Sequence, residues 1–191
     1  MTSTLARNAC HALVMAAVAF VAFAASATPV SATPPANFRA FGQGHEPSTT
    51  PDCSFATGNK LCPSGDSCTC TPIAGKGTCA AMGGPISYTA TVATDISISA
   101  GGCAGSFGTA TLVSLLNPSN QVVLNFSGTL CSTPASVTVN PANVVNAIYF
   151  IDGASSSGIF HNATGSGNVS GSRDSNIAVL GSIIGTIKLQ P

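Results

Sequence analysis

Five cysteines lie within one short stretch of the chain, where their thiols could bind a metal ion or pair as disulfides. They are Cys53, Cys62, Cys68, Cys70 and Cys79, with eight, five, one and eight residues between successive members and no histidine among them. Zinc sites commonly take their cysteines from pairs about two to four residues apart. The spacing therefore favours disulfides, and we predict no metal site here.

The residues around these cysteines cannot build a hydrophobic core, because they are almost all polar, glycine or proline. Turn signals occur at 58–59, 63–66 and 75–77. We therefore predict a small module over residues 53–80 that depends on its disulfides. Each disulfide of this kind typically contributes about 2–4 kcal/mol by restricting the unfolded chain.

The N-terminus has the pattern of a signal peptide over residues 1–27. Arg7 and His11 precede the apolar run 12–24, and a small-residue cleavage site follows at 25–27. The apolar run is short of the roughly 20 residues that a membrane span needs. We expect a protein that is secreted, periplasmic or on the cell surface, without a membrane span once the signal is removed. Disulfides persist in those compartments.

Two further cysteines, Cys103 and Cys131, flank predicted strands and are 28 residues apart. We predict a disulfide that ties these neighbouring strands, contributing about 3–4 kcal/mol for a loop of this size. Seven cysteines remain once Cys10 leaves with the signal peptide, so one is left without an intramolecular partner. We predict that the odd cysteine is Cys53, which could bridge to a second chain.

The end of the cysteine-rich stretch resembles the end of an EGF-like module. It has Cys68-x-Cys70 followed after eight residues by Cys79, with glycines before the last cysteine. The stretch has five cysteines where that family has six, and it lacks the family's aromatic residue between the last glycines. The resemblance implies that Cys70 pairs with Cys79 and that two of Cys53, Cys62 and Cys68 pair with each other. Calcium, which some such modules bind, needs several carboxylates, and none cluster here.

The remainder of the chain reads as a linker followed by an all-β domain. Residues 28–52 contain five prolines and no periodic pattern, as expected for an extended or disordered linker. From Ile86 onward apolar and polar residues alternate, with turn signals every 8–12 residues. Seven to nine short strands indicate a sandwich or a barrel, and we predict an antiparallel β-sandwich over 86–191. A helical turn or two within 142–150 stays open.

Few side chains could carry catalysis. His161 lies near Asp152 and the serines at 155–157, but residues 153–158 miss a nucleophile-elbow motif by one position. The carboxylates of the β region are Asp95, Asp152 and Asp174, which offers little for glycoside hydrolysis. We therefore predict no catalytic residue and no cofactor.

The composition disfavours nucleic acid as a partner. Charged residues make up 6% of the chain, and no basic patch is present to neutralise phosphates. Low charge also leaves sheet edges poorly protected against pairing with other strands, so self-association or an envelope partner stays open.

The function we predict is that of a secreted or cell-envelope, non-enzymatic structural or binding protein. The alternatives are a secreted hydrolase or enzyme inhibitor that uses the cysteine module for recognition, and a periplasmic metal-binding protein.

Overall fold

The computed structural model describes residues 34–48, 68–95, 102–132, 143–174 and 178–190. These residues form eight strands and two short 3-10 helices. The strands are β1 (Ala36–His45), β2 (Cys68–Cys79), β3 (Gly84–Asp95), β4 (Cys103–Ser114), β5 (Gln121–Ser132), β6 (Asn143–Ile151), β7 (Thr164–Arg173) and β8 (Ala178–Lys188), and the helices are η2 (Ala80–Met82) and η3 (Gly158–Phe160). The predicted signal peptide and the cysteines Cys10, Cys53 and Cys62 lie outside the described residues. Within the described part, no helix has the length and apolar character needed to cross a membrane.

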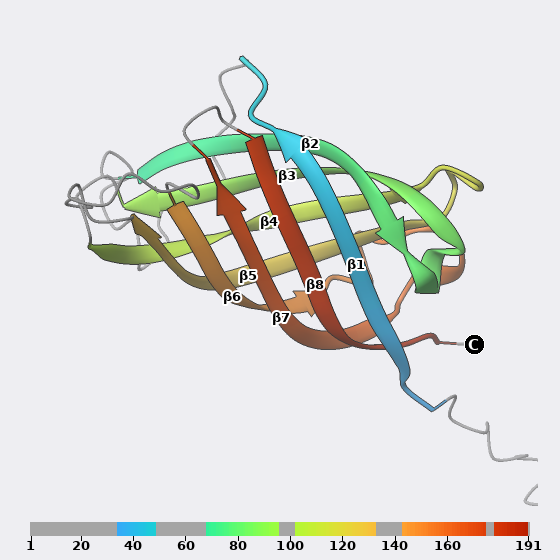
Figure 1. The fold of residues 1–191 in the computed structure, drawn as a ribbon. Helices are drawn as coiled ribbons and strands as arrows, with labels where there is room; N and C mark the ends of the chain where they lie inside the picture. Colours follow the sequence, from blue (N-terminus) through green and yellow to red (C-terminus); the bar gives the residue numbers. More distant parts are fainter. Residues whose placement is uncertain (1–33, 49–67, 96–101, 133–142, 175–177, 191) are drawn as a thin grey trace, which may run out of the picture. The chain divides into compact units, whose positions relative to one another are not determined.

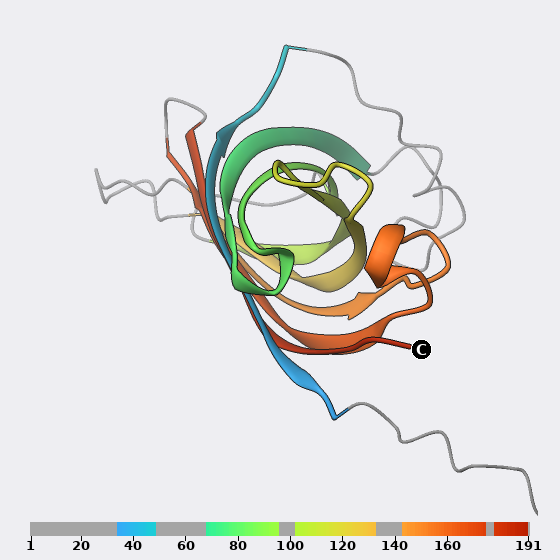
Figure 2. The ribbon, with the colours of Figure 1, turned by 90° about the vertical axis from the view of Figure 1, so that its right-hand side faces the viewer.

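The eight strands form one closed antiparallel barrel in chain order (Figure 1). Each strand pairs with the next, and β8 returns to pair with β1 from Ala36↔Ile187 to His45↔Ala178. Figure 2, turned to look along the barrel, shows β1 in blue beside β8 in red. The all-β antiparallel prediction is confirmed, but the predicted sandwich is wrong. Alternation with a period of two is common to both architectures, and it does not say whether a sheet closes on itself.

The barrel closes because two of its strands come from stretches that we expected to lie outside the β domain. β1 falls in the predicted linker, and β2 falls in the predicted cysteine module. β2 pairs with β3 along its whole length, from Cys68↔Asp95 to Cys79↔Gly84. The glycines at 75 and 77, which we took as a turn signal, lie inside this strand. Closure also removes the exposed edges that suggested strand-to-strand self-association, since every described strand has a neighbour on both sides.

One end of the barrel is filled by large apolar side chains, and we call it the packed end. It is the end at which β2, β4, β6 and β8 finish. Met82 from η2 and Phe160 from η3 add buried side chains to this core. The largest fully buried side chains are Tyr149, Phe38, Phe160, Ile86, Leu112 and Leu124. At roughly 1.5–3 kcal/mol for each large apolar side chain buried, this core is the main source of the barrel's stability.

The inward-facing aromatic residues of the strands each lie opposite a glycine. The register pairs Phe38 with Gly185, Tyr88 with Gly75, Phe126 with Gly108 and Tyr149 with Gly167. At Gly108, a Cβ atom would lie 2.7 Å from Cζ of Phe126 and would also collide with the carbonyl oxygen of Thr91. Glycine is thus required where strands curve tightly and an aromatic ring crosses the neighbouring strand. This requirement accounts for part of the high glycine content of the sequence.

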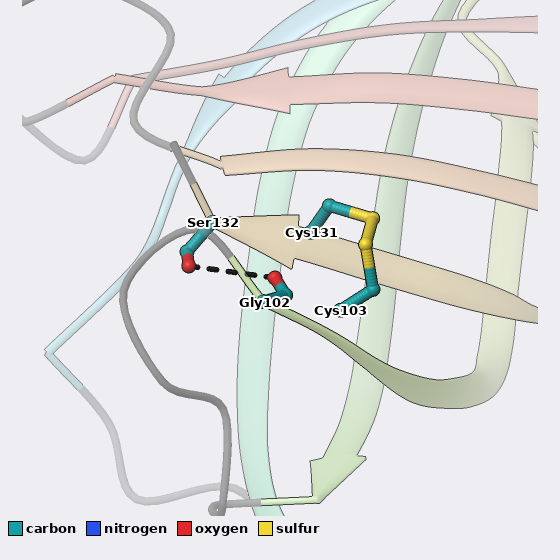
Figure 3. Close-up of a disulfide and its surroundings, with 4 residues drawn as sticks. All are labelled: Gly102, Cys103, Cys131 and Ser132. Carbon is teal, nitrogen blue, oxygen red and sulfur yellow. Dashed lines mark hydrogen bonds between the residues drawn. A yellow bond between two sulfur atoms is a disulfide. The ribbon is translucent and has the colours of Figure 1, made fainter. Parts of the chain in front are cut away.

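The predicted disulfide between Cys103 and Cys131 is present, and it joins residues directly opposite each other on β4 and β5 (Figure 3). Beside it, Ser132 donates a backbone hydrogen bond of 2.9 Å to the carbonyl oxygen of Gly102, and its Oγ lies 3.5 Å from the same oxygen (Figure 3). The bridge lies within the barrel wall and ties two adjacent strands.

The pairing of Cys70 with Cys79 that the EGF-like resemblance implies is wrong. Among the described cysteines, Cys79 is a free, buried thiol, whereas Cys68 and Cys70 are disulfide-bonded. Cys79 lies nine positions after Cys70 in the strand, roughly 30 Å away at about 3.3 Å per residue. A disulfide requires Cα atoms within about 7 Å, so an extended β2 excludes this pairing. Cys53, which we predicted to be the odd cysteine, lies outside the described residues.

Candidate functional site

The barrel encloses a cavity of about 280 Å³ between the packed end and the opposite end. Residues of all eight strands contribute to its wall. Its apolar inward-facing side chains are Ala40, Ile73, Ile86, Tyr88, Ala90, Val92, Ala110, Leu112, Leu124, Phe126, Leu130, Val145, Val169, Val179 and Ile183. An engineered apolar cavity of about 150 Å³ can hold one benzene molecule, so this cavity has room for a ligand roughly twice that size.

The end of the barrel opposite the packed end carries polar side chains, and we call it the polar end. Thr69 lies opposite Thr94 in the β2–β3 register, and Thr94 lies opposite Ser106 on β4. The hydroxyl of Ser106 is buried and has no hydrogen-bond partner among the described residues. Asn143 contributes an amide from the start of β6. Several hydrogen-bonding groups therefore gather at this end of the mainly apolar cavity.

At the polar end, an ion pair links the end of β7 to the residue that follows β1. Arg173, the last residue of β7, donates a hydrogen bond of 3.0 Å from Nη2 to Oε2 of Glu46, and its Nε contacts the other carboxylate oxygen. Within the described part of the chain, these two are the charged residues of the cavity lining. β8 lies between β1 and β7, so the pair spans β8 and connects the strands on both sides of it. The side chains are 38% and 16% exposed.

Tyr88 is the polar aromatic residue of the cavity wall. Its ring crosses Gly75 on β2 and reaches β1, where Cε1 lies 2.6 Å from the position that a Cβ at residue 42 would occupy. Burial raises the pKa of Tyr88 above its ordinary value of 10.0. The phenol is therefore neutral at physiological pH and offers the cavity a ring face and a hydroxyl without charge.

Cys79 and Tyr149 lie together in the packed end. Burial raises the pKa of Tyr149 to about 12, and the nearby Cys79 adds a smaller increase. Burial also raises the pKa of the Cys79 thiol, against hydrogen bonds from the backbone of Met82 and Ala81 that lower it. A nucleophilic cysteine requires a lowered pKa and access to solvent. Cys79 has neither, so we assign it to the core.

The residues considered for catalysis lie in the connection from β6 to β7, at the packed end. Asp152 accepts a hydrogen bond of 2.8 Å from Oγ of Ser155, which is the main reason that its pKa is lowered. Nδ1 of His161 lies 3.4 Å from the carbonyl oxygen of Ser156. The Ser156 hydroxyl accepts from the backbone of Val123. These groups hold the connection in shape and do not form a Ser-His-Asp relay.

The candidate carboxylates Asp174 and Asp152 lie at opposite ends of the barrel. Asp174 follows β7 and accepts a hydrogen bond of 2.9 Å from the backbone of Ala178. Asp152 lies at the other end of the barrel, after β6. Among the described residues, no three His, Cys, Asp or Glu side chains lie close enough together to hold a metal ion.

Sequence reasoning did not identify the residues that form the cavity. Glu46 fell in the predicted linker and Thr69 in the predicted module, so neither was assigned to the wall of a β domain. The alternation from Ile86 to Val92 did identify which side chains share one face of β3. The sequence does not reveal the register of the strands. The register determines that this face of β3 lines a cavity and that Gly42, Gly181 and Gly171 lie side by side on adjacent strands.

Comparison of the chain with protein-family models, with curated proteins and with solved structures finds no match. The functional assignment therefore depends on the geometry of the cavity.

Proposed function

We propose that this protein is an exported binding protein that holds a small apolar molecule inside its barrel. The observation that carries the proposal is the cavity of about 280 Å³ inside the barrel, whose wall is mainly apolar. Small eight-stranded barrels have interiors that side chains can just fill, so an unfilled interior is space that the fold does not require. Apolar walls with a few polar groups at one end are typical of small-molecule sites.

The size of the cavity limits the ligand and its affinity. A ligand of roughly ten non-hydrogen atoms fits the volume, and ligands commonly gain much less than the ceiling of about 1.5 kcal/mol per atom. A gain of about 0.4–0.8 kcal/mol per atom corresponds to a dissociation constant between about 1 mM and 1 µM, which is the range we expect. The polar end offers hydroxyls and an amide, so a hydroxyl or carbonyl group on the ligand would face that end.

Binding without catalysis fits the side chains around the cavity better than hydrolysis does. The tyrosine of the wall is neutral, and the carboxylate of the lining is already paired with Arg173. Export is part of the proposal, supported by the signal-like N-terminus and by the disulfide between Cys103 and Cys131. The hydrolase, inhibitor and metal-binding alternatives have no comparable observation in their favour.

The proposal is tested by titrating the purified protein with two neutral probes, naphthol and decanol, and recording binding by calorimetry. At least one probe should bind the unaltered protein with one-to-one stoichiometry. Ala90→Leu adds bulk to the cavity wall and should weaken binding of whichever probe binds. Thr89→Leu adds a similar side chain on the outer, exposed face of the same strand, and it should leave binding unchanged. Absence of binding by both probes would refute the proposed function.

A further inference from the structure

Three glycines lie side by side across the cavity wall, and we call them the glycine strip. Gly42 on β1 lies opposite Gly181 on β8, and Gly181 lies opposite Gly171 on β7. All three contribute to the lining of the cavity. At Gly181 and Gly171 the wall therefore presents peptide backbone to the cavity, whereas at Gly42 the Tyr88 ring covers the backbone.

Two of these glycines are not required by the backbone. At Gly171 the nearest atom to a Cβ would be the carbonyl oxygen of Leu180 at 3.3 Å, and at Gly181 it would be that of Ser170 at 3.7 Å. Neither residue has a positive φ. By contrast, a Cβ at Gly75 or Gly167 would collide with the backbone of the next strand. Glycine weakens a strand interior because it has no side chain to pack. At residues 171 and 181 its effect is to leave open space on the cavity side of the wall.

The glycine strip has boundaries on every side. The Tyr88 ring lies against Gly42 at one end, and Val145 lies opposite Gly171 at the other. In the register, the next inward-facing residues toward the packed end are Ile183 and Val169. Toward the polar end the next are Val179 on β8 and, opposite it on β7, Arg173. The result is a flat recess beside one aromatic ring, with the charged Arg173 at its polar side.

We propose that the glycine strip binds a planar ring, so that the ligand of this cavity is an aromatic or similarly flat ring compound and not a flexible acyl chain. This inference rests on the proposed function. A flat ring can lie on exposed peptide planes where side chains would hold it away, and Tyr88 can contact the ring in an offset or edge-to-face arrangement. The volume of about 280 Å³ suits two fused rings by comparison with the roughly 150 Å³ that holds one benzene.

The test compares naphthol, a planar two-ring alcohol, with decanol, a flexible alcohol that has the same number of non-hydrogen atoms. Gly181→Val and Gly171→Val place branched side chains on the strip. The Cβ atom has room at residue 181, and at residue 171 it requires the carbonyl oxygen of Leu180, 3.3 Å away, to move by a few tenths of an ångström. We expect each variant to weaken naphthol binding by about tenfold or more while decanol binding changes little. Thr89→Leu is the matched control, because it adds bulk on the outer, exposed face of β3 and should spare naphthol. Thermal unfolding confirms that every variant is folded.

The outcomes separate the two proposals. If decanol binds the unaltered protein and naphthol does not, the planar-ring inference is wrong and the binding function stands. If both glycine variants bind naphthol as tightly as the unaltered protein does, the strip is not where the ring lies. If neither probe binds, the binding function fails and the inference fails with it.

Discussion

Tyr149 lies directly opposite Gly167 across the β6–β7 pair, and its ring occupies the space that a side chain at residue 167 would need. A Cβ there would be 2.8 Å from Cε1 of Tyr149 and would also collide with the carbonyl oxygen of Ile184. The ring continues to β8, where its hydroxyl lies 2.5 Å from the Cβ position of Gly185. One aromatic side chain thus spans three strands, and glycines make this possible.

Gly167→Ala should destabilise the barrel by about 1–3 kcal/mol, because the added methyl group displaces either the Tyr149 ring or the strand. Gly181→Ala is the matched control, with the same chemical change at a site where a Cβ has room. It should leave stability unchanged or raise it by about 0.5 kcal/mol. Urea unfolding of both variants measures the difference. Equal changes in stability at the two positions would show that the collision at residue 167 does not determine the stability of the barrel.

The buried phenol of Tyr149 should make the protein sensitive to alkali. Its pKa is raised from 10.0 to about 12 in the folded protein, so the unfolded chain loses this proton first. The stabilisation that depends on the neutral phenol is therefore complete below pH 10 and is lost as the pH rises toward 12. The loss amounts to about 2–3 kcal/mol.

Tyr149→Phe should remove much of this loss between pH 10 and 12, and urea unfolding at several pH values measures it. Near pH 7 the substitution should be neutral or stabilising, since the Tyr149 hydroxyl has no hydrogen-bond partner among the described residues. Tyr88→Phe is the control, because Tyr88 is less buried. An alkaline profile of Tyr149→Phe identical to that of the unaltered protein would show that other groups cause the loss.

The Cys79 thiol should be unreactive in the folded protein. It is buried and burial raises its pKa, so little thiolate forms at pH 8 and reagents cannot reach it. Maleimide labelling without reductant, followed by peptide mass spectrometry, should find Cys79 unlabelled under native conditions and labelled after denaturation. Cys79 recovered in a disulfide with Cys70 would contradict the structure.

The disulfides of Cys68 and Cys70 should involve Cys53 and Cys62. Cys103 is paired with Cys131 and Cys79 is free, so these are the cysteines that remain apart from Cys10 in the predicted signal peptide. Proteolysis of the non-reduced protein and mass spectrometry of the linked peptides tests this elimination. A monomer with a free thiol at Cys53 would contradict it.

The ion pair of Glu46 and Arg173 should contribute modestly to stability. Pairs with this much solvent exposure typically contribute about 0–1 kcal/mol. A double-mutant cycle with Glu46→Gln and Arg173→Gln isolates the interaction between the two side chains. Its coupling energy should fall as salt is added. A coupling near zero at low salt would mean that the pair does not connect β1 to β7.

The sequence predicted the antiparallel all-β class and the Cys103–Cys131 disulfide because both depend on local patterns, namely alternation and a cysteine beside each strand. It did not predict closure. β1 is flanked by prolines and β2 is rich in glycine, so the composition of these stretches indicated a linker and turns instead of strands. Their glycines serve the curvature of the barrel and the passage of the Tyr88 ring, and those requirements appear only when β1, β2 and β3 are placed in register. The cavity was missed for the same reason.

The most direct test of the central claim is a methyl-labelled NMR titration of the unaltered protein with naphthol and decanol. Binding inside the barrel predicts saturable shifts for the methyl groups of Val145, Val169 and Ile183, which line the cavity. The exposed methyl groups of Ile148 and Leu116 should not shift. Shifts confined to Ile148, Leu116 and other surface methyl groups, with the cavity methyl groups unchanged, would contradict the claim that this barrel binds a ligand in its interior.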